Sequence, residues 1–155
     1  MKYRNDFVTN SSSSNFLVVF KSVTERNRMF EELKRNYPNY ASTIIEDILR
    51  SKVSRKEIID TLKSELESKA YWKYYWGISE NWNRGYDINP YQDPNIQAKV
   101  KEYVKIELEK ILKELPSRGN YAIVCYGDED GSFYSDLEHE IMPYLDFVFR
   151  RINNH

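Results

Sequence analysis

Four segments of this sequence repeat apolar residues at helical spacing, and residues that begin or end helices bound each of them. Their N-terminal signals are Thr24, Thr43, Ser54 and the pair Asp93–Pro94. The second and third signals are each followed three residues later by a glutamate, which is the capping-box pattern. The fourth segment has the longest apolar stripe and continues to Pro116. Because the chain has only 5 glycines and 5 prolines, turns are few and helices should dominate.

Three other stretches have the composition of β-strands. Phe16–Phe20 and Tyr121–Tyr126 are apolar runs of the kind found in buried strands, and Phe147–Ile152 alternates like an edge strand. A short helix is expected over Ser135–Met142. Together these elements predict an α+β fold in which a small sheet of about two or three strands is covered by about four to five helices. A length of 155 residues suits a single domain, residues 1–155.

The charge balance excludes a strongly basic protein that would be drawn to nucleic acid or to a membrane surface. The 23 Lys and Arg residues balance 24 Asp and Glu, for a formal net charge of -1. The longest apolar run, Phe16–Phe20, is too short for a signal peptide or a membrane span. We therefore expect a cytoplasmic protein. Its one cysteine, Cys125, allows no intrachain disulfide and is expected in the core as a small hydrophobic residue.

Four consecutive serines, Ser11–Ser14, precede the first predicted strand. Their hydroxyls can bond nearby backbone groups and order a turn that leads into the strand. Alternatively they can form a donor-rich loop for an anion, although the run lacks the glycines and the lysine of a phosphate-binding loop. The run is therefore either a structural lead-in or a weak anion-site candidate.

The segment around these serines resembles an opening found in known proteins. The stretch Arg4–Phe16 reads RNDFVTNSSSSNF, and it is similar to the start of many small bacterial and bacteriophage proteins of no assigned function. The shared pattern is Phe-Val, then Ser or Thr, then Asn, a serine run and Phe; here Asn15 stands where another serine is common. The resemblance implies a bacterial or bacteriophage origin, and it implies no particular reaction.

An acidic cluster lies between Gly127 and Glu140, where six carboxylates occur with no Lys or Arg. Carboxylates and an imidazole at turn and helix spacing can bind a divalent cation, which can activate water for hydrolysis. The candidate metal ligands are Asp128, Asp130, Asp136, His139 and Glu140. Alternatively, Asp residues favour turns and acids favour helix N-termini, so the cluster has a purely structural explanation. A third use is docking of a basic partner.

An aromatic cluster between Tyr71 and Tyr91 contains all 3 tryptophans of the chain, beside a long segment rich in Asn, Gly and Pro. Tyr and Trp combine a large contact area with a polar tip, which suits a protein interface or a stacking platform for bases or sugars. The candidate interaction residues are Trp72, Tyr75, Trp76, Trp82 and Tyr86. Alternatively, the rings pin the long segment to the helices as a small second core. The interaction hypothesis predicts that at least one of the tryptophans is substantially exposed.

The sequence lacks the motifs of most enzymes. It has no glycine-rich phosphate loop and no nucleophile elbow, and its only histidines are His139 and His155. Few basic residues accompany the aromatic cluster, so nucleic-acid binding is disfavoured. The sequence therefore predicts a non-enzymatic protein that binds another protein, without a cofactor. The alternative is a metal-binding or metal-dependent hydrolytic domain that uses the acidic cluster.

Overall fold

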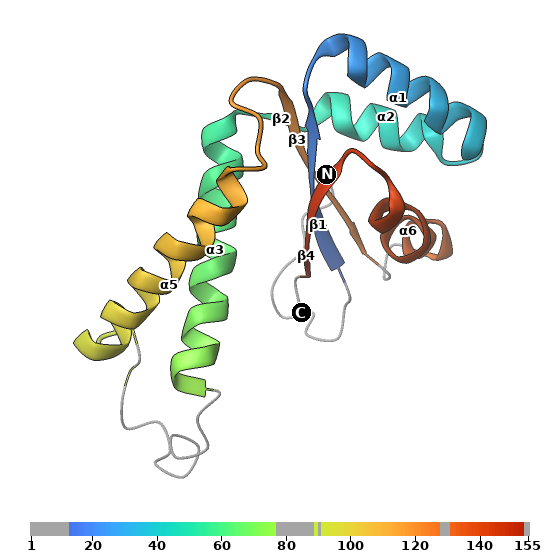
Figure 1. Ribbon diagram of the computed structural model, residues 1–155. Helices are drawn as coiled ribbons and strands as arrows, with labels where there is room; N and C mark the ends of the chain where they lie inside the picture. The colour runs from blue at the N-terminus through green and yellow to red at the C-terminus, as the bar shows by residue number, and fades with distance from the viewer. Residues whose placement is uncertain (1–12, 77–88, 90, 128–130, 154–155) are drawn as a thin grey trace. The chain divides into compact units, whose positions relative to one another are not determined.

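The computed structural model describes residues 13–76, 89, 91–127 and 131–153. In this part of the chain the fold is α+β, with five α-helices and an open antiparallel sheet of four strands (Figure 1). The predicted fold class is confirmed. The chain divides into two compact units, one formed by Met1–Ile58 with Ser117–His155 and the other by Ile59–Pro116. We describe the first as the sheet unit and the second as the helical unit.

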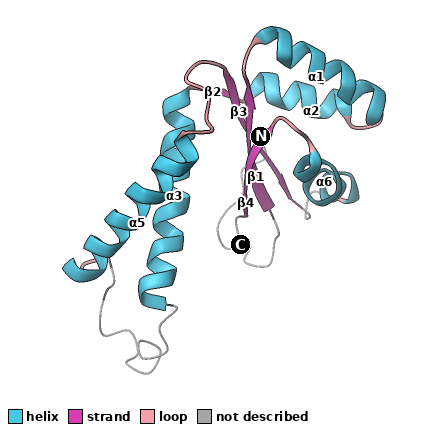
Figure 2. Cartoon of the chain, in the orientation of Figure 1, coloured by secondary structure: helices cyan, strands magenta, loops and turns pink. Residues whose placement is uncertain are grey.

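The sheet joins strands from both ends of the sequence (Figure 2). Its order is β2-β3-β1-β4, and the strands are β1 (Ser13–Phe20), β2 (Lys52–Val53), β3 (Asn120–Gly127) and β4 (Val148–Asn153). Strand β1 pairs with β3 along its whole length and with β4 on its other side. The sheet has more strands than the two or three expected because the two-residue strand β2, which has no signal of its own, pairs with β3.

Strand β1 begins earlier than its apolar run. Ser13 and Ser14 belong to the strand, where Ser13 pairs with Gly127 and Ser14 with Tyr126, and both serine side chains are buried. A lead-in turn was expected for these two residues, and that expectation is wrong for them. Polar residues are strand residues here because two neighbouring strands pair with this stretch of backbone. Ser11 and Ser12 lie outside the described residues.

The core of the sheet unit lies between one face of the sheet and the helices α1 (Val23–Asn36) and α2 (Ala41–Arg50). Figure 1 shows α1, α2 and α6 on the same side of the sheet. Phe16, Val18 and Phe20 alternate along β1 and point into this core, as the period of a strand requires. The core side chains from the helices include Phe30, Leu33, Ile44 and Ile48.

The starts of these two helices differ from the sequence prediction. Helix α1 is capped by Ser22, whose hydroxyl accepts a hydrogen bond from the Glu25 backbone N–H, so Thr24 lies inside the helix. Helix α2 begins at Ala41, and Thr43 is likewise inside it. Cys125 is also misplaced by the prediction, because it is exposed on β3 instead of buried. In a continuous apolar run, no polar position marks which side chains face away from the core.

The C-terminal helical segment is built from three short pieces. Helix α6 (Ser132–Asp136) continues as a π-helix, η3 (Leu137–Ile141), and then as a 3₁₀ turn, η4 (Met142–Tyr144). The helix therefore begins three residues before the expected Ser135. Leu137, Ile141 and Met142 are buried in the core of the sheet unit.

The helical unit contains α3 from Ile59 onward, the π-helix η1 (Trp72–Trp76) and α5 (Pro94–Leu112). Helix α3 spans Arg55–Tyr71, and its capping box is formed as predicted: Ser54 Oγ accepts from the Glu57 N–H at 3.1 Å, and Glu57 Oε2 accepts from the Ser54 N–H at 2.8 Å. The Asp93 cap of α5 is also confirmed. None of the described helices has the length and apolar character that a bilayer crossing needs.

Candidate functional site

The aromatic cluster and the acidic cluster each contain one of the two π-helices found among the described residues. The aromatic cluster includes η1, and the acidic cluster includes η3. A π-turn inserts one residue into a helix and rotates the following side chains, and such turns recur at functional sites. Each cluster is therefore considered as a candidate site within its own unit.

The aromatic cluster presents rings to solvent. The side chains of Trp72 and Tyr91 are each 59% exposed, although Trp is highly buried on average in folded proteins. The Tyr91 ring lies against Tyr71, with ring centroids 4.5 Å apart. Helix η1 places Trp72 one residue after the end of α3, and the Tyr71 contact fixes the position of the Tyr91 ring. The predicted exposure of at least one tryptophan is confirmed.

Beside Trp72, a lysine is held between two tyrosines. The Lys73 Nζ lies 5.3 Å from the ring centroid of Tyr74 and 5.3 Å from that of Tyr103 on α5. The two rings meet edge to face, with centroids 6.2 Å apart. The ring faces attract the ammonium group. Lys73 is exposed, and no carboxylate of the described residues forms an ion pair with it.

We use the term aromatic surface for the group formed by Tyr71, Trp72, Lys73, Tyr74, Tyr91 and Tyr103. Of the predicted interaction residues, only Trp72 has a described side chain. The side chains of Tyr75 and Trp76, and all of Trp82 and Tyr86, lie outside the described residues. The sequence did not indicate the contribution of Lys73 and Tyr103, because their contact joins two segments that are distant in sequence.

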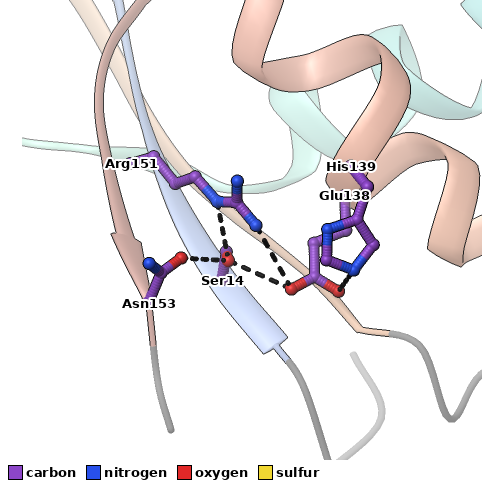
Figure 3. Close-up of polar contacts among 5 residues, drawn as sticks. All are labelled: Ser14, Glu138, His139, Arg151 and Asn153. Atoms are coloured by element: carbon purple, nitrogen blue, oxygen red, sulfur yellow. Dashed lines mark hydrogen bonds and ion pairs between the residues drawn. The ribbon is translucent and has the colours of Figure 1, made fainter.

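The acidic cluster places one carboxylate in the interior of the sheet unit. Glu138 is fully buried, and its carboxylate lies beside residues from β1 and β4 (Figure 3). Ser14 Oγ lies 3.1 Å from Glu138 Oε1 and 3.0 Å from Asn153 Oδ1. Arg151 Nε donates to Ser14 Oγ at 3.0 Å, and its guanidinium lies 3.6 Å from Glu138 Oε1. His139 Nε2 lies 3.4 Å from the other oxygen, Oε2.

These five residues, Ser14, Glu138, His139, Arg151 and Asn153, form what we call the polar cluster. It superficially contains the residue types of a serine hydrolase. However, Ser14 is fully buried and its hydroxyl contacts the carboxylate directly, whereas His139 contacts the opposite oxygen. Nucleophilic catalysis requires an accessible serine with a general base at its hydroxyl. The geometry instead suits a structural role that ties β1 and β4 to η3.

The metal candidates that the structure describes face different partners. Asp136 Oδ2 accepts a hydrogen bond from the Tyr40 hydroxyl at 2.9 Å. This bond, together with burial and the negative charge of Asp136, raises the pKa of Tyr40. His139 faces Glu138, and Glu140 is exposed. Across the residues described, no three His, Cys, Asp or Glu side chains are grouped to hold a metal ion. Asp128 and Asp130 lie outside that part of the chain.

The sequence offered no signal for the polar cluster. Ser14 and Glu138 are separated by 124 positions, and helical spacing put Glu138 on a different face from Asp136, His139 and Glu140. Glu138 stands between two apolar core positions, Leu137 and Ile141, but this local pattern does not identify Ser14 or Arg151 as its partners.

Comparison with known proteins leaves the function to be argued from this geometry. No protein-family model, no curated protein and no solved structure matches the chain.

Proposed function

We propose that this chain is a small non-enzymatic binding protein that contacts a partner protein through its aromatic surface. The observation that carries the proposal is the 59% exposure of Trp72. Large exposed aromatic side chains mark interaction sites, and Trp and Tyr are enriched among the residues that dominate binding energy. The resemblance of the opening segment supports a bacterial or bacteriophage origin for such a protein.

The energy available at this position is substantial. A fully buried Trp removes about 150–250 Å² from water, so the exposed part of Trp72 leaves about 100–150 Å² for a partner to cover. At about 25 cal/mol per Å², covering it contributes about 3 kcal/mol of gross hydrophobic free energy, from which the costs of association are subtracted. The Tyr91 ring packs against Tyr71, and the Lys73 ammonium group contacts the rings of Tyr74 and Tyr103. A surface fixed in advance loses less conformational entropy on binding.

Site-specific photocrosslinking tests the proposal. The photoreactive residue p-benzoylphenylalanine replaces Trp72 in one variant, and it replaces Lys63, an exposed residue of α3, in a matched control. Both proteins are expressed in bacterial cells and irradiated. We expect a discrete adduct of higher mass at position 72 and none at position 63. Absence of an adduct at position 72, or an identical adduct pattern at both positions, would contradict the proposal.

A further inference from the structure

Helices α1 and α2 of the sheet unit leave an open groove along their seam. The two helices are joined by the short connection 37–40, so they run antiparallel, and they lie side by side (Figure 1). The groove contains about 450 Å³ of space, and small-molecule sites span about 300–1,000 Å³. Its walls are mostly apolar and are formed by Pro38, Ala41, Ile45 and Leu49. The groove therefore has the size and the lining of a site for an apolar group.

A small crevice adjoins this groove at Leu49, because that side chain lines both hollows. The crevice lies where the end of α2 meets strands β1, β2 and β3, and its walls are also mostly apolar. Its polar side chains are Arg26, Lys52 and Asn120. Its space is about 10 Å³, enough for one group the size of a water molecule. The crevice is therefore too small to be a site by itself, and it forms a polar end of the groove.

The crevice is positively charged. Its lining holds the guanidinium of Arg26 and the ammonium of Lys52, and it holds no carboxylate. The Arg26 guanidinium contacts two uncharged groups, the Asn27 amide oxygen at 3.3 Å and the Phe30 ring. No carboxylate of the described residues forms an ion pair with Arg26 or Lys52. Glu25, which precedes Arg26, accepts from a backbone N–H and lies outside the lining. An anionic group at this end of the groove therefore meets two cations.

The other charges of the groove cancel. Its lining includes one cation, Lys34, and one carboxylate, Glu46. Lys34 forms an ion pair with Glu31 at 3.1 Å, and Glu46 forms one with Arg50 at 2.9 Å. The net positive charge of the lining is thus confined to the crevice, so the seam is apolar along its length and cationic at one end.

We propose that this seam binds a single-chain amphiphile with an anionic head group. The acyl chain lies in the groove, and the carboxylate lies at the mouth of the crevice beside Arg26 and Lys52. The α2 side chains that line the groove extend from Ala41 to Leu49, about 12 Å at 1.5 Å per residue, which suits an acyl chain of medium length. Burial of the chain provides affinity, and the two cations select the charge of the head group. The site belongs to the sheet unit, so it does not depend on the aromatic surface.

An extended anionic surface is a poorer match for this seam. Nucleic acids and anionic membranes present many charges, and proteins that bind them use rows of cations. The crevice offers two cations, at one end of an apolar groove. Two charges suit a single head group better than a polyanion, so a membrane surface is treated as a competing outcome of the test.

Isothermal titration calorimetry with matched decyl compounds tests the proposal. The full-length protein is titrated with sodium decanoate, 1-decanol and decyltrimethylammonium chloride, each below the concentration at which it aggregates, and with sodium butyrate. The three decyl compounds share a chain and differ in the charge of the head group, whereas butyrate keeps the carboxylate and shortens the chain. We expect decanoate to bind at least about 10-fold more tightly than decyltrimethylammonium, and butyrate to show no measurable binding.

Variants of the lining residues locate the site. The double variant Arg26→Gln/Lys52→Gln removes both cations and should weaken decanoate binding by about 5-fold. Its matched control, Arg35→Gln, removes an exposed cation of α1 outside the lining and should change binding by less than about 2-fold. Leu49→Gln places a polar side chain in the wall that both hollows share and should weaken binding similarly. Its control is Ile106→Gln, because Ile106 is 44% exposed on α5 and Leu49 is 41% exposed. Circular dichroism confirms that each variant is folded.

Three results would overturn the proposal. The first is a failure of decanoate to bind, or equal affinities for the anionic and the cationic decyl compound. The second is a loss of decanoate binding in either control variant as large as the loss in its lining variant. The third is cosedimentation with phosphatidylglycerol vesicles, and not with phosphatidylcholine vesicles, by a protein that does not bind free decanoate. This last result would favour a membrane surface as the ligand.

Discussion

Replacing Ser14 with alanine should destabilise the sheet unit measurably. The substitution removes a hydroxyl that contacts the Glu138 carboxylate at 3.1 Å and accepts from Arg151 at 3.0 Å. A hydrogen bond to a charged group contributes about 1.5–3 kcal/mol. The two losses do not add fully, because the Arg151 guanidinium remains 3.6 Å from Glu138. We therefore expect the free energy of unfolding to fall by about 3 kcal/mol, a combined value for two charge-assisted bonds.

Urea denaturation followed by far-ultraviolet circular dichroism measures this loss, since it reports on both units. Tryptophan fluorescence follows the helical unit separately, because all 3 tryptophans of the chain lie within it. In a thermal melt the same loss corresponds to about 6–12 °C in Tm for a protein of this size. Ser132→Ala is the matched control, since Ser132 is exposed on α6, and it should change stability by less than about 0.5 kcal/mol.

A double-mutant cycle with Glu138→Gln separates the polar cluster from a general effect of the substitution. If the hydroxyl acts through the carboxylate, the double variant should lose less stability than the sum of the single variants, by about 1 kcal/mol. A Ser14→Ala protein as stable as Ser132→Ala, or strictly additive losses in the cycle, would refute the reasoning that the polar cluster holds β1 to η3.

Three further outcomes follow from the structure. Burial, with the charge of Asp47 and a 2.9 Å hydrogen bond to it, raises the pKa of Tyr126. Above pH 10 only the unfolded state loses this proton, so the free energy of unfolding decreases as pH rises. In urea titrations, Tyr126→Phe should reduce the slope of this decrease by up to about 1.4 kcal/mol per pH unit. Gly119→Ala should cost about 1–3 kcal/mol in the same assay, because a Cβ there would lie 2.5 Å from the Phe20 carbonyl oxygen; an unchanged midpoint would contradict that clash. The described residues group no metal ligands, so we expect Mg²⁺, Mn²⁺, Ca²⁺ and Zn²⁺ to leave Tm within about 1 °C of its value in chelator; a larger rise would support the metal hypothesis, because a ligand that binds only the folded state raises Tm.

Local signals in the sequence predicted the parts of the fold whose partners lie close along the chain. The Ser54 capping box and the Asp93 cap each join residues within three positions, and both are formed. The start of α1 was misplaced by two residues because Ser22 and Thr24 are both good caps, and only the extended backbone at Ser22 decides between them.

The candidate sites were predictable only in part, because their geometry depends on long-range packing. Composition indicated that the aromatic cluster would reach solvent, and Trp72 does. The contact between Lys73 and Tyr103 depends on how two helical segments meet, and no periodicity encodes it. Helical spacing only set Glu138 apart from Asp136, His139 and Glu140; its buried environment beside Arg151 and Ser14 comes from strands that are distant in sequence.

The order of the strands also determines when the sheet can assemble during synthesis. Strand β1 pairs only with β3 and β4 among the described strands, so its apolar residues have no sheet partner until β3 (Asn120–Gly127) has left the ribosome. The helical unit, Ile59–Pro116, lies between them in sequence. A nascent chain therefore carries an unpaired Phe16–Phe20 segment until β3 emerges, and this is the stage at which it is most exposed to aggregation and to capture by chaperones.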